Sequence, residues 1–296
     1  MILCAERAPA SAVHLIVMSR APVPGRTKTR LIPAFGAEAA AAFHAACLAE
    51  VLAEGDAWRH AVAPQGQARA LTLCVTPPES WPDFVRAGIV LPPGAALTVQ
   101  QGETLGARMA HALHGVLGTA ALGSAALGTA SGGALGRFSG GATGGAMTGG
   151  PALAHAGAAL LVGSDLPLLS RSHLEAACAA LLGGTGLPDG AAPGADVVLG
   201  PAEDGGYYLI GVRAGSRWPE LLDAEDWGGG TVLQRTLATA GRIGLTVAQL
   251  APLPDADTPE DLARILAHPQ AATGRPSLAL VRRMLGAPYP PPRGGC

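Results

Sequence analysis

The sequence predicts an α/β domain built on a mostly parallel β-sheet. Short apolar runs alternate with segments of helical periodicity, which is typical of repeated strand–helix units. Two of these runs stop abruptly at acidic and glycine residues: Gly163-Ser164-Asp165 follows one, and Glu203-Asp204-Gly205-Gly206 follows the other. Ligands of open α/β sheets bind beyond the carboxyl ends of the strands. Carboxylates at these positions could therefore hold a metal ion or an electropositive substrate.

The first part of the chain is expected to contribute three strands. Val13–Met18 is an unbroken apolar run, Leu71–Thr76 is a second that Pro77-Pro78 ends, and Ala96–Val99 is the third. Apolar residues at helical spacing predict the helices Glu38–Leu52, Pro82–Ala87 and Leu105–Leu117.

The composition changes after the third of these helices. From about residue 118 to 157 the chain is almost wholly Gly, Ala, Ser and Thr, without the large side chains that offset the entropy of ordering. We expect a flexible surface insertion there. The sequence thus predicts a single domain over residues 12–285, interrupted by this insertion and followed by a disordered Pro/Gly-rich tail at 286–296.

Strands and helices resume after the insertion. Apolar runs predict the strands Ala158–Val162, Val197–Leu199, Tyr207–Val212 and Leu245–Leu250. Helical periodicity predicts Ser172–Leu182, with Ser170 or Ser172 as its cap, then Thr231–Ala240 and Pro259–Leu266.

Composition narrows the range of partners. Apolar residues make up 49% of the chain, and the formal net charge is -2, so nothing favours binding to nucleic acid or an anionic membrane. No run approaches the roughly 20 apolar residues needed to cross a bilayer. The five cysteines are scattered and show no metal-binding spacing. We expect a cytoplasmic protein that binds small molecules.

A basic loop follows the first predicted strand. Between Arg20 and Leu31 it carries Arg26, Lys28 and Arg30, with Pro24-Gly25 before them. A glycine that lets the backbone approach closely, followed by cationic donors, suits a phosphate group. The Gly-Lys-Ser/Thr step of a Walker A loop is absent. The alternative is a solvated basic loop.

A second candidate phosphate site opens the helix after the third strand. Gln101 and Gly102 precede the helix, and Arg108 lies in its first turn. The amino-terminal end of a helix attracts anions. A purely structural turn is the alternative.

Three acidic segments are candidates for metal or substrate binding. Asp165 could bind Mg²⁺ or Mn²⁺, which prefer oxygen ligands, or could serve as a turn residue. The adjacent carboxylates of Glu203 and Asp204 would repel each other unless they share a cation or donor, although a plain hairpin is the alternative. Asp255 and Asp257 lie just before a helix that Thr258 can cap, so helix capping does not explain them.

Taken in order, these segments resemble the GT-A-fold nucleotide-diphospho-sugar transferase superfamily, and more narrowly its bacterial DUF2064 group. The resemblance rests on the basic loop at 24–31, Gln101-Gly102 through Met109, Gly163 to Pro167, Gly200 to Gly211, and Asp255 to Leu262. It implies a three-layer Rossmann-like GT-A fold with a mostly parallel mixed sheet and helices on both faces.

The resemblance also implies roles for individual residues. Asp165 and Asp257 would hold Mg²⁺ or Mn²⁺ on the donor diphosphate, and Asp204 would face the acceptor. Lys28 and Arg30 would stabilise the leaving group. The remaining nucleotide contacts would come from Pro24, Gly25, Gln101, Gly102, Arg108, Ser164, Gly205 and Gly206.

The function expected from this set is a metal-dependent transferase that uses a nucleotide donor. A glycosyltransferase, acting on a nucleotide-diphospho-sugar and a small acceptor, is the first expectation. A nucleotidylyltransferase that releases pyrophosphate is an alternative, because 2-phospholactate guanylyltransferases and molybdenum-cofactor nucleotidylyltransferases look similar in the basic loop and in Asp257 to Leu262. A nucleotide-binding module without catalysis is the other alternative.

Overall fold

The computed structural model describes residues 12–63, 67–118, 156–183, 194–223, 227, 230–272 and 274–286. The predicted insertion and tail lie outside these residues, apart from their boundaries. No helix in the described ranges is long and apolar enough to cross a membrane.

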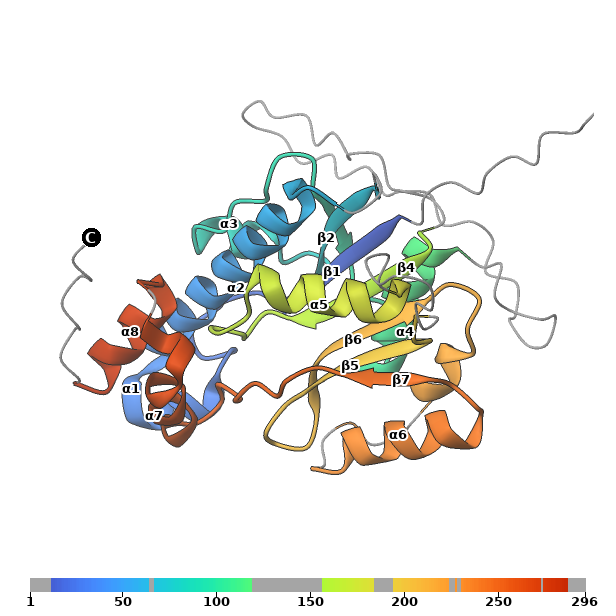
Figure 1. The fold of residues 1–296 in the computed structure, drawn as a ribbon. Helices are drawn as coiled ribbons and strands as arrows, with labels where there is room; N and C mark the ends of the chain where they lie inside the picture. Colours follow the sequence, from blue (N-terminus) through green and yellow to red (C-terminus); the bar gives the residue numbers. More distant parts are fainter. Residues whose placement is uncertain are drawn as a thin grey trace, which may run out of the picture.

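The described strands form one seven-stranded sheet with the order β3-β2-β1-β4-β6-β5-β7 (Figure 1). Strand β6 runs antiparallel to its neighbours β4 and β5, and every other adjacent pair is parallel. This arrangement confirms the predicted mostly parallel mixed sheet. The strands are β1 (Val13–Arg20), β2 (Arg69–Thr76), β3 (Ala96–Val99), β4 (Ala158–Gly163), β5 (Val197–Pro201), β6 (Tyr207–Arg213) and β7 (Val247–Gln249).

Helices cover both faces of the sheet. Strand β1 shows the two layers directly: Leu15 and Val17 pack into one core with α2, α3, α5, α7 and α8, whereas Ile16 and Met18 pack into the other with α4, η4 and α6. The helices are α1 (Ile32–Phe35), α2 (Ala37–His60), α3 (Trp81–Arg86), α4 (Leu105–Leu117), α5 (Arg171–Leu182), α6 (Val232–Arg242), α7 (Pro259–Ala267) and α8 (Pro276–Met284). Three 3₁₀ turns join them: η1 (Thr29–Leu31), η4 (Trp218–Leu221) and η5 (Pro269–Ala272). The predicted three-layer architecture is confirmed.

Apart from shifts of a few residues at the ends of strands and helices and the short helix α1, which was not predicted, two helices differ from the sequence-based expectation. Helix α2 continues to His60, beyond the expected end at Leu52, and Gly55 lets it lie close to the sheet. A Cβ at Gly55 would lie only 2.9 Å from the Leu15 Cδ2 atom. Helix α8 was not predicted, and its first turn is held by α2, because the carboxylate of Glu50 accepts bonds from the Ser277 amide (2.7 Å) and hydroxyl (2.6 Å).

Two glycines of helix α4 should respond in opposite ways to replacement by alanine. A Cβ at Gly106 would lie 2.2 Å from the Leu222 carbonyl oxygen, so Gly106→Ala should destabilise the fold by about 1–3 kcal/mol. Gly115 has no neighbour within 4 Å of such a Cβ, and Gly115→Ala should stabilise the helix by up to about 1 kcal/mol. Urea denaturation of the two variants tests this, and equal midpoints would contradict it.

Candidate active site

A cavity of about 600 Å³ opens at the carboxyl end of the parallel strands. Most of its lining comes from the loop after β1, the end of β4 with the turn that follows, the β5–β6 turn with the start of β6, and the stretch between β7 and α7, and further residues come from α2 and α4. The ionisable side chains of its lining are Arg20, Arg26, Lys28, Arg30, His44, Arg108, Asp165, Asp204, Asp255 and Asp257. The candidate residues therefore lie where an α/β sheet binds its ligands.

The loop after β1 places Lys28 in an unfavourable backbone conformation. Its φ of 48° and ψ of 44° are left-handed, and no other non-glycine residue in the described ranges has a positive φ. Such a conformation costs on the order of 1–3 kcal/mol and is typically kept where function needs it. Here it precedes η1 and directs the side chain inward, where only 4% of it is exposed.

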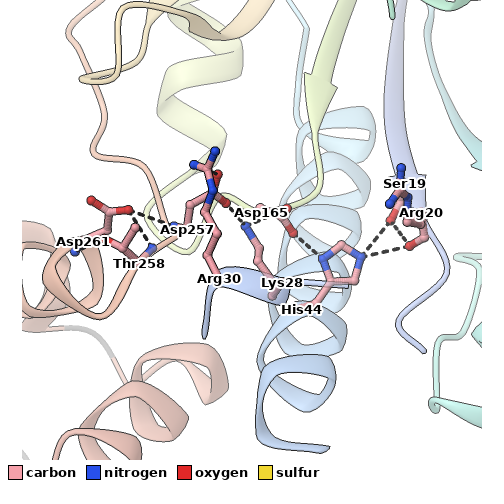
Figure 2. A network of polar contacts seen from close by, with 9 residues as sticks. All are labelled: Ser19, Arg20, Lys28, Arg30, His44, Asp165, Asp257, Thr258 and Asp261. Atoms are coloured by element: carbon pink, nitrogen blue, oxygen red, sulfur yellow. Dashed lines mark hydrogen bonds and ion pairs between the residues drawn. The ribbon is translucent and has the colours of Figure 1, made fainter. Parts of the chain in front are cut away.

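The Lys28 ammonium group lies between the two predicted metal ligands (Figure 2). Its Nζ is 2.8 Å from Asp165 Oδ2 and 2.7 Å from Asp257 Oδ1. Burial alone would lower the pKa of Lys28, but the two carboxylates outweigh burial and raise it above its usual value. The same contacts, with His44, lower the pKa of Asp165 against the opposing effect of its burial. Asp165 and Lys28 are thus charged at neutral pH.

His44, on the buried face of α2, was not predicted as a site residue. Its Nδ1 bonds to Asp165 Oδ1, and its Nε2 lies 2.9 Å from the Arg20 carbonyl oxygen and 3.4 Å from Ser19 Oγ (Figure 2). Both ring nitrogens therefore face acceptors, an arrangement that favours the doubly protonated imidazolium. Burial acts to lower the pKa of His44, yet the Asp165 carboxylate and these hydrogen bonds raise it overall.

The raised pKa of His44 predicts a pH-dependent contribution to stability. Because the folded pKa lies above the ordinary value of 6.5, the contribution is fully present below about pH 6.5 and is lost as pH rises through the folded pKa. His44→Gln should therefore cost about 1–3 kcal/mol at pH 6 and less at pH 9. Urea denaturation of both proteins across this range measures the difference, and a cost that grows with pH would contradict the assignment.

The two predicted metal ligands do not fit a resident divalent ion in this arrangement. Each oxygen of Asp165 already has a cationic partner, and the ammonium occupies the space between Asp165 and Asp257. No group of three or more His, Cys, Asp or Glu side chains in the described ranges could hold a metal ion. Mg²⁺ is usually held by one or two carboxylates together with waters and substrate phosphates, so the obstacle here is the Lys28 ammonium, which already contacts both carboxylates.

The β5–β6 turn contributes Asp204 to the lining of the cavity. Gly205, with a φ of 88°, lets the chain turn tightly, and Asp204 Oδ1 accepts a bond of 2.7 Å from the Gly206 amide. The Asp204 amide donates to Asp255 Oδ2 at 2.8 Å. Burial, with the charges of Asp204 and Asp257, raises the pKa of Asp255 to about 6. The adjacent Glu203 is instead paired with Arg264, 3.3 Å away.

Four arginines line the same cavity as the buried Lys28. Arg30 is 74% exposed and lies 3.8 Å from Asp257 Oδ2, so it is only loosely held. The Nε of Arg108 donates to the Gly102 carbonyl at 2.9 Å, which orients the guanidinium from the first turn of α4. Arg20 and Arg26 also line the cavity from the loop after β1. This part of the cavity lining can receive an anion.

The structure brings most of the predicted site residues together, but not all of them. Those that line the cavity are Lys28, Arg30, Arg108, Ser164, Asp165, Asp204, Gly206 and Asp257. Those that do not line it are Pro24, Gly25, Gln101, Gly102 and Gly205. Gly25, Gly102 and Gly205 have positive φ angles, so their contribution to the site is the turn geometry of the backbone.

His44 was not predicted from the sequence, and Arg20, Arg26 and Asp255 were given no individual role in the predicted site, although a signal for His44 was present. His44 is an ionisable residue on the apolar stripe of α2, with Ala40 and Leu48 one turn to either side. A buried polar group of this kind requires a partner. Lys28, which was predicted as a site residue, also stands out because it is the only lysine of the sequence.

Comparisons with known proteins give the family. Residues 60–229 match the DUF2064 family, described as "Uncharacterized protein conserved in bacteria". A protein from Desulfovibrio desulfuricans G20, provisionally assigned as a nucleotide-diphospho-sugar transferase, has a crystal structure that superposes with a TM-score of 0.67 at 25% identity. That match covers 93% of this chain and 96% of the other.

Two further solved structures have TM-scores too low to carry an argument. CMP:2-keto-3-deoxy-manno-octonic acid synthetase complexed with CTP gives 0.43 at 11% identity, over 87% of this chain and 98% of that one. Glucosyl-3-phosphoglycerate synthase from Mycobacterium tuberculosis, with Mg²⁺ and UDP, gives 0.38 at 11% identity, over 94% and 81%. No curated protein matches the sequence. Because residues 60–229 are more than half of this 296-residue chain, the protein belongs to the DUF2064 family, and its fold is that of the nucleotide-diphospho-sugar transferases.

Proposed function

We propose that this protein is a glycosyltransferase that moves a sugar from a nucleotide-diphospho-sugar to a small acceptor. One observation carries the proposal: the lining of a single cavity of about 600 Å³ has a cationic part, Lys28, Arg30 and Arg108, and also contains the carboxylates of Asp204 and Asp255 as an acidic part. A volume of this order suits a small-molecule ligand. The structural similarity to a provisionally assigned nucleotide-diphospho-sugar transferase over nearly the whole chain supports the same class.

The cationic part of the lining suits the donor diphosphate. Two of the three N–H bonds of the Lys28 ammonium point at Asp165 and Asp257, and no third acceptor from the described residues lies within hydrogen-bonding distance. The remaining N–H can donate to a phosphate oxygen. Arg30 and Arg108 would add guanidinium groups, which match phosphate geometry. Donors fixed before the reaction stabilise the negative charge that develops on a leaving group.

The acidic part of the lining suits the acceptor. In the transfer, an acceptor hydroxyl oxygen forms a bond to the anomeric carbon as the bond between that carbon and the phosphate oxygen breaks. The electron pair of the broken bond remains on the nucleoside diphosphate, next to Lys28 and Arg30. The hydroxyl proton passes to the Asp204 carboxylate, whose Oδ2 has no hydrogen-bond partner among the described residues.

Product analysis tests this function against its alternatives. The protein is incubated with a panel of UDP-, GDP-, CDP- and dTDP-sugars and, separately, with nucleoside triphosphates, and the products are separated by chromatography with mass detection. We expect a nucleoside diphosphate to be released in an acceptor-dependent reaction that Asp204→Asn abolishes. Release of pyrophosphate from a triphosphate would instead identify a nucleotidylyltransferase. Binding without either product would identify a non-catalytic module, and each of these results would overturn the proposal.

A further inference from the structure

We propose that Lys28 is the resident cation of the Asp165–Asp257 pair, standing where a divalent metal ion was expected. The inference rests on the proposed function only for the identity of the phosphate that the ammonium receives. The position of the cation itself follows from the geometry of this chain's residues.

The first argument is that the ammonium bridges the two carboxylates. It makes contacts of 2.8 Å to one and 2.7 Å to the other, and its side chain is 4% exposed. A metal ion in the same place would have to displace this group. The displaced ammonium would then lose two charged partners, which is costly for a side chain as buried as that of Lys28.

The second argument is that both oxygens of Asp165 already have a cationic partner. Its Oδ1 bonds to His44, and its Oδ2 bonds to Lys28. His44 is itself fixed, because Nε2 bonds to the carbonyl oxygen of Arg20 at the end of β1. The carboxylate is thus oriented by two cations from different elements, and His44 acts as a positioning residue for it.

The third argument comes from the backbone and the composition. Lys28 adopts a left-handed conformation that favours glycine, so this position is strained for the sake of its side chain. Lys28 is also the only lysine of the sequence, and all the other residues of the Lys/Arg class are arginines. An ammonium is a compact point charge, whereas a planar guanidinium is a rigid fork that binds carboxylates in a different geometry.

The chemical consequence concerns how the donor is held. The two carboxylates neutralise and orient the ammonium, and its free N–H is directed to the ligand. The diphosphate is then held by groups of the chain itself, namely Lys28 with the flanking arginines. A divalent ion that accompanies the nucleotide would be bound by the phosphates and not by Asp165 and Asp257.

Binding of Mn²⁺ to the full chain tests the inference without any need for activity. Electron paramagnetic resonance of free Mn²⁺ should detect no saturable site that depends on Asp257 in the wild type up to about 1 mM. Lys28→Met removes the ammonium and leaves two facing carboxylates. This variant should therefore gain one Mn²⁺ site, with a Kd at least about tenfold below the 1 mM limit at which the wild type shows none. The double variant Lys28→Met/Asp257→Asn is the matched control, and it should lose that site again.

Two results would overturn the inference. One is a saturable Mn²⁺ site in the wild type that Asp257→Asn or Asp165→Asn abolishes. The other is a folded Lys28→Met variant, judged by circular dichroism, that gains no Mn²⁺ site.

A measurement on the wild type alone covers the case in which Lys28→Met does not fold. Because Lys28 is the only lysine, the side-chain ¹⁵Nζ signal of lysine-labelled protein belongs to it. We expect this signal to be unchanged on adding Mg²⁺, and a shift to that of a solvent-exposed lysine would show displacement. Failure to bind any nucleotide would contradict the proposed function but would leave the Mn²⁺ result intact.

Discussion

Lys28→Met is expected to lower kcat/KM for the nucleotide donor by about 100- to 1000-fold, the cost of removing one pre-positioned donor from a site of developing charge. The variant keeps an unbranched side chain only one atom shorter but removes the ammonium that Asp165 and Asp257 orient. The loss should appear in kcat as well as in KM, because the charge on the leaving group grows in the transition state. Steady-state kinetics with the donor identified by product analysis provide the measurement.

Lys28→Arg is the informative companion to this variant. It preserves the charge, but the planar fork of a guanidinium cannot reproduce the contacts of a compact ammonium with both carboxylates. We therefore expect little rescue of activity. Full activity in Lys28→Arg would show that charge alone is needed, and it would contradict the bridging role.

Asp204→Asn is expected to lower kcat by about 100- to 10,000-fold, with little change in the affinity for the donor. The amide retains the hydrogen bond to Gly206, so the turn should persist, but it cannot take up a proton. We propose that Asp204 takes up the proton of the acceptor substrate. The loss should therefore be confined to the transfer step in which that substrate reacts.

Glu203→Gln is the matched control for Asp204→Asn. Glu203 lies next to it in the same turn, but its carboxylate is paired with Arg264 on α7 and does not line the cavity. Its replacement should leave kcat within about threefold of the wild type, as is usual for a surface ion pair. Equal losses in the two variants would indicate a role for the turn rather than for the Asp204 carboxylate.

The sequence was sufficient to predict the sheet and most of the helices because their signals are local. Strand β3 and helix α4 begin and end at the expected residues, and Thr258 caps α7 as expected. Helix α8 was missed because its first turn is held by Glu50, which is 227 residues away in the chain. No window of sequence around Pro276 carries that information.

The candidate site was only partly predictable for the same reason. Asp165, Asp257 and Lys28 were each recognised from their local motifs, and they do lie together. Their mutual arrangement was not recognised, because it depends on a left-handed residue and on the packing of α2 against the end of β1. Motifs indicate which residue types are present, whereas the tertiary structure decides which of them neutralise one another.

Titration of nucleoside diphosphates into the protein tests the central claim most directly, namely that this cavity binds the diphosphate of a donor through Lys28. Isothermal titration calorimetry is performed with UDP, GDP, CDP and dTDP on the wild type and on folded Lys28→Met, with EDTA present. We expect the wild type to bind at least one of these nucleotides at one saturable site. Its affinity should be about 10- to 100-fold lower in Lys28→Met, which is the expected cost of losing a charged hydrogen bond. Absence of binding by all four nucleotides, or equal affinity in the two proteins, would contradict it.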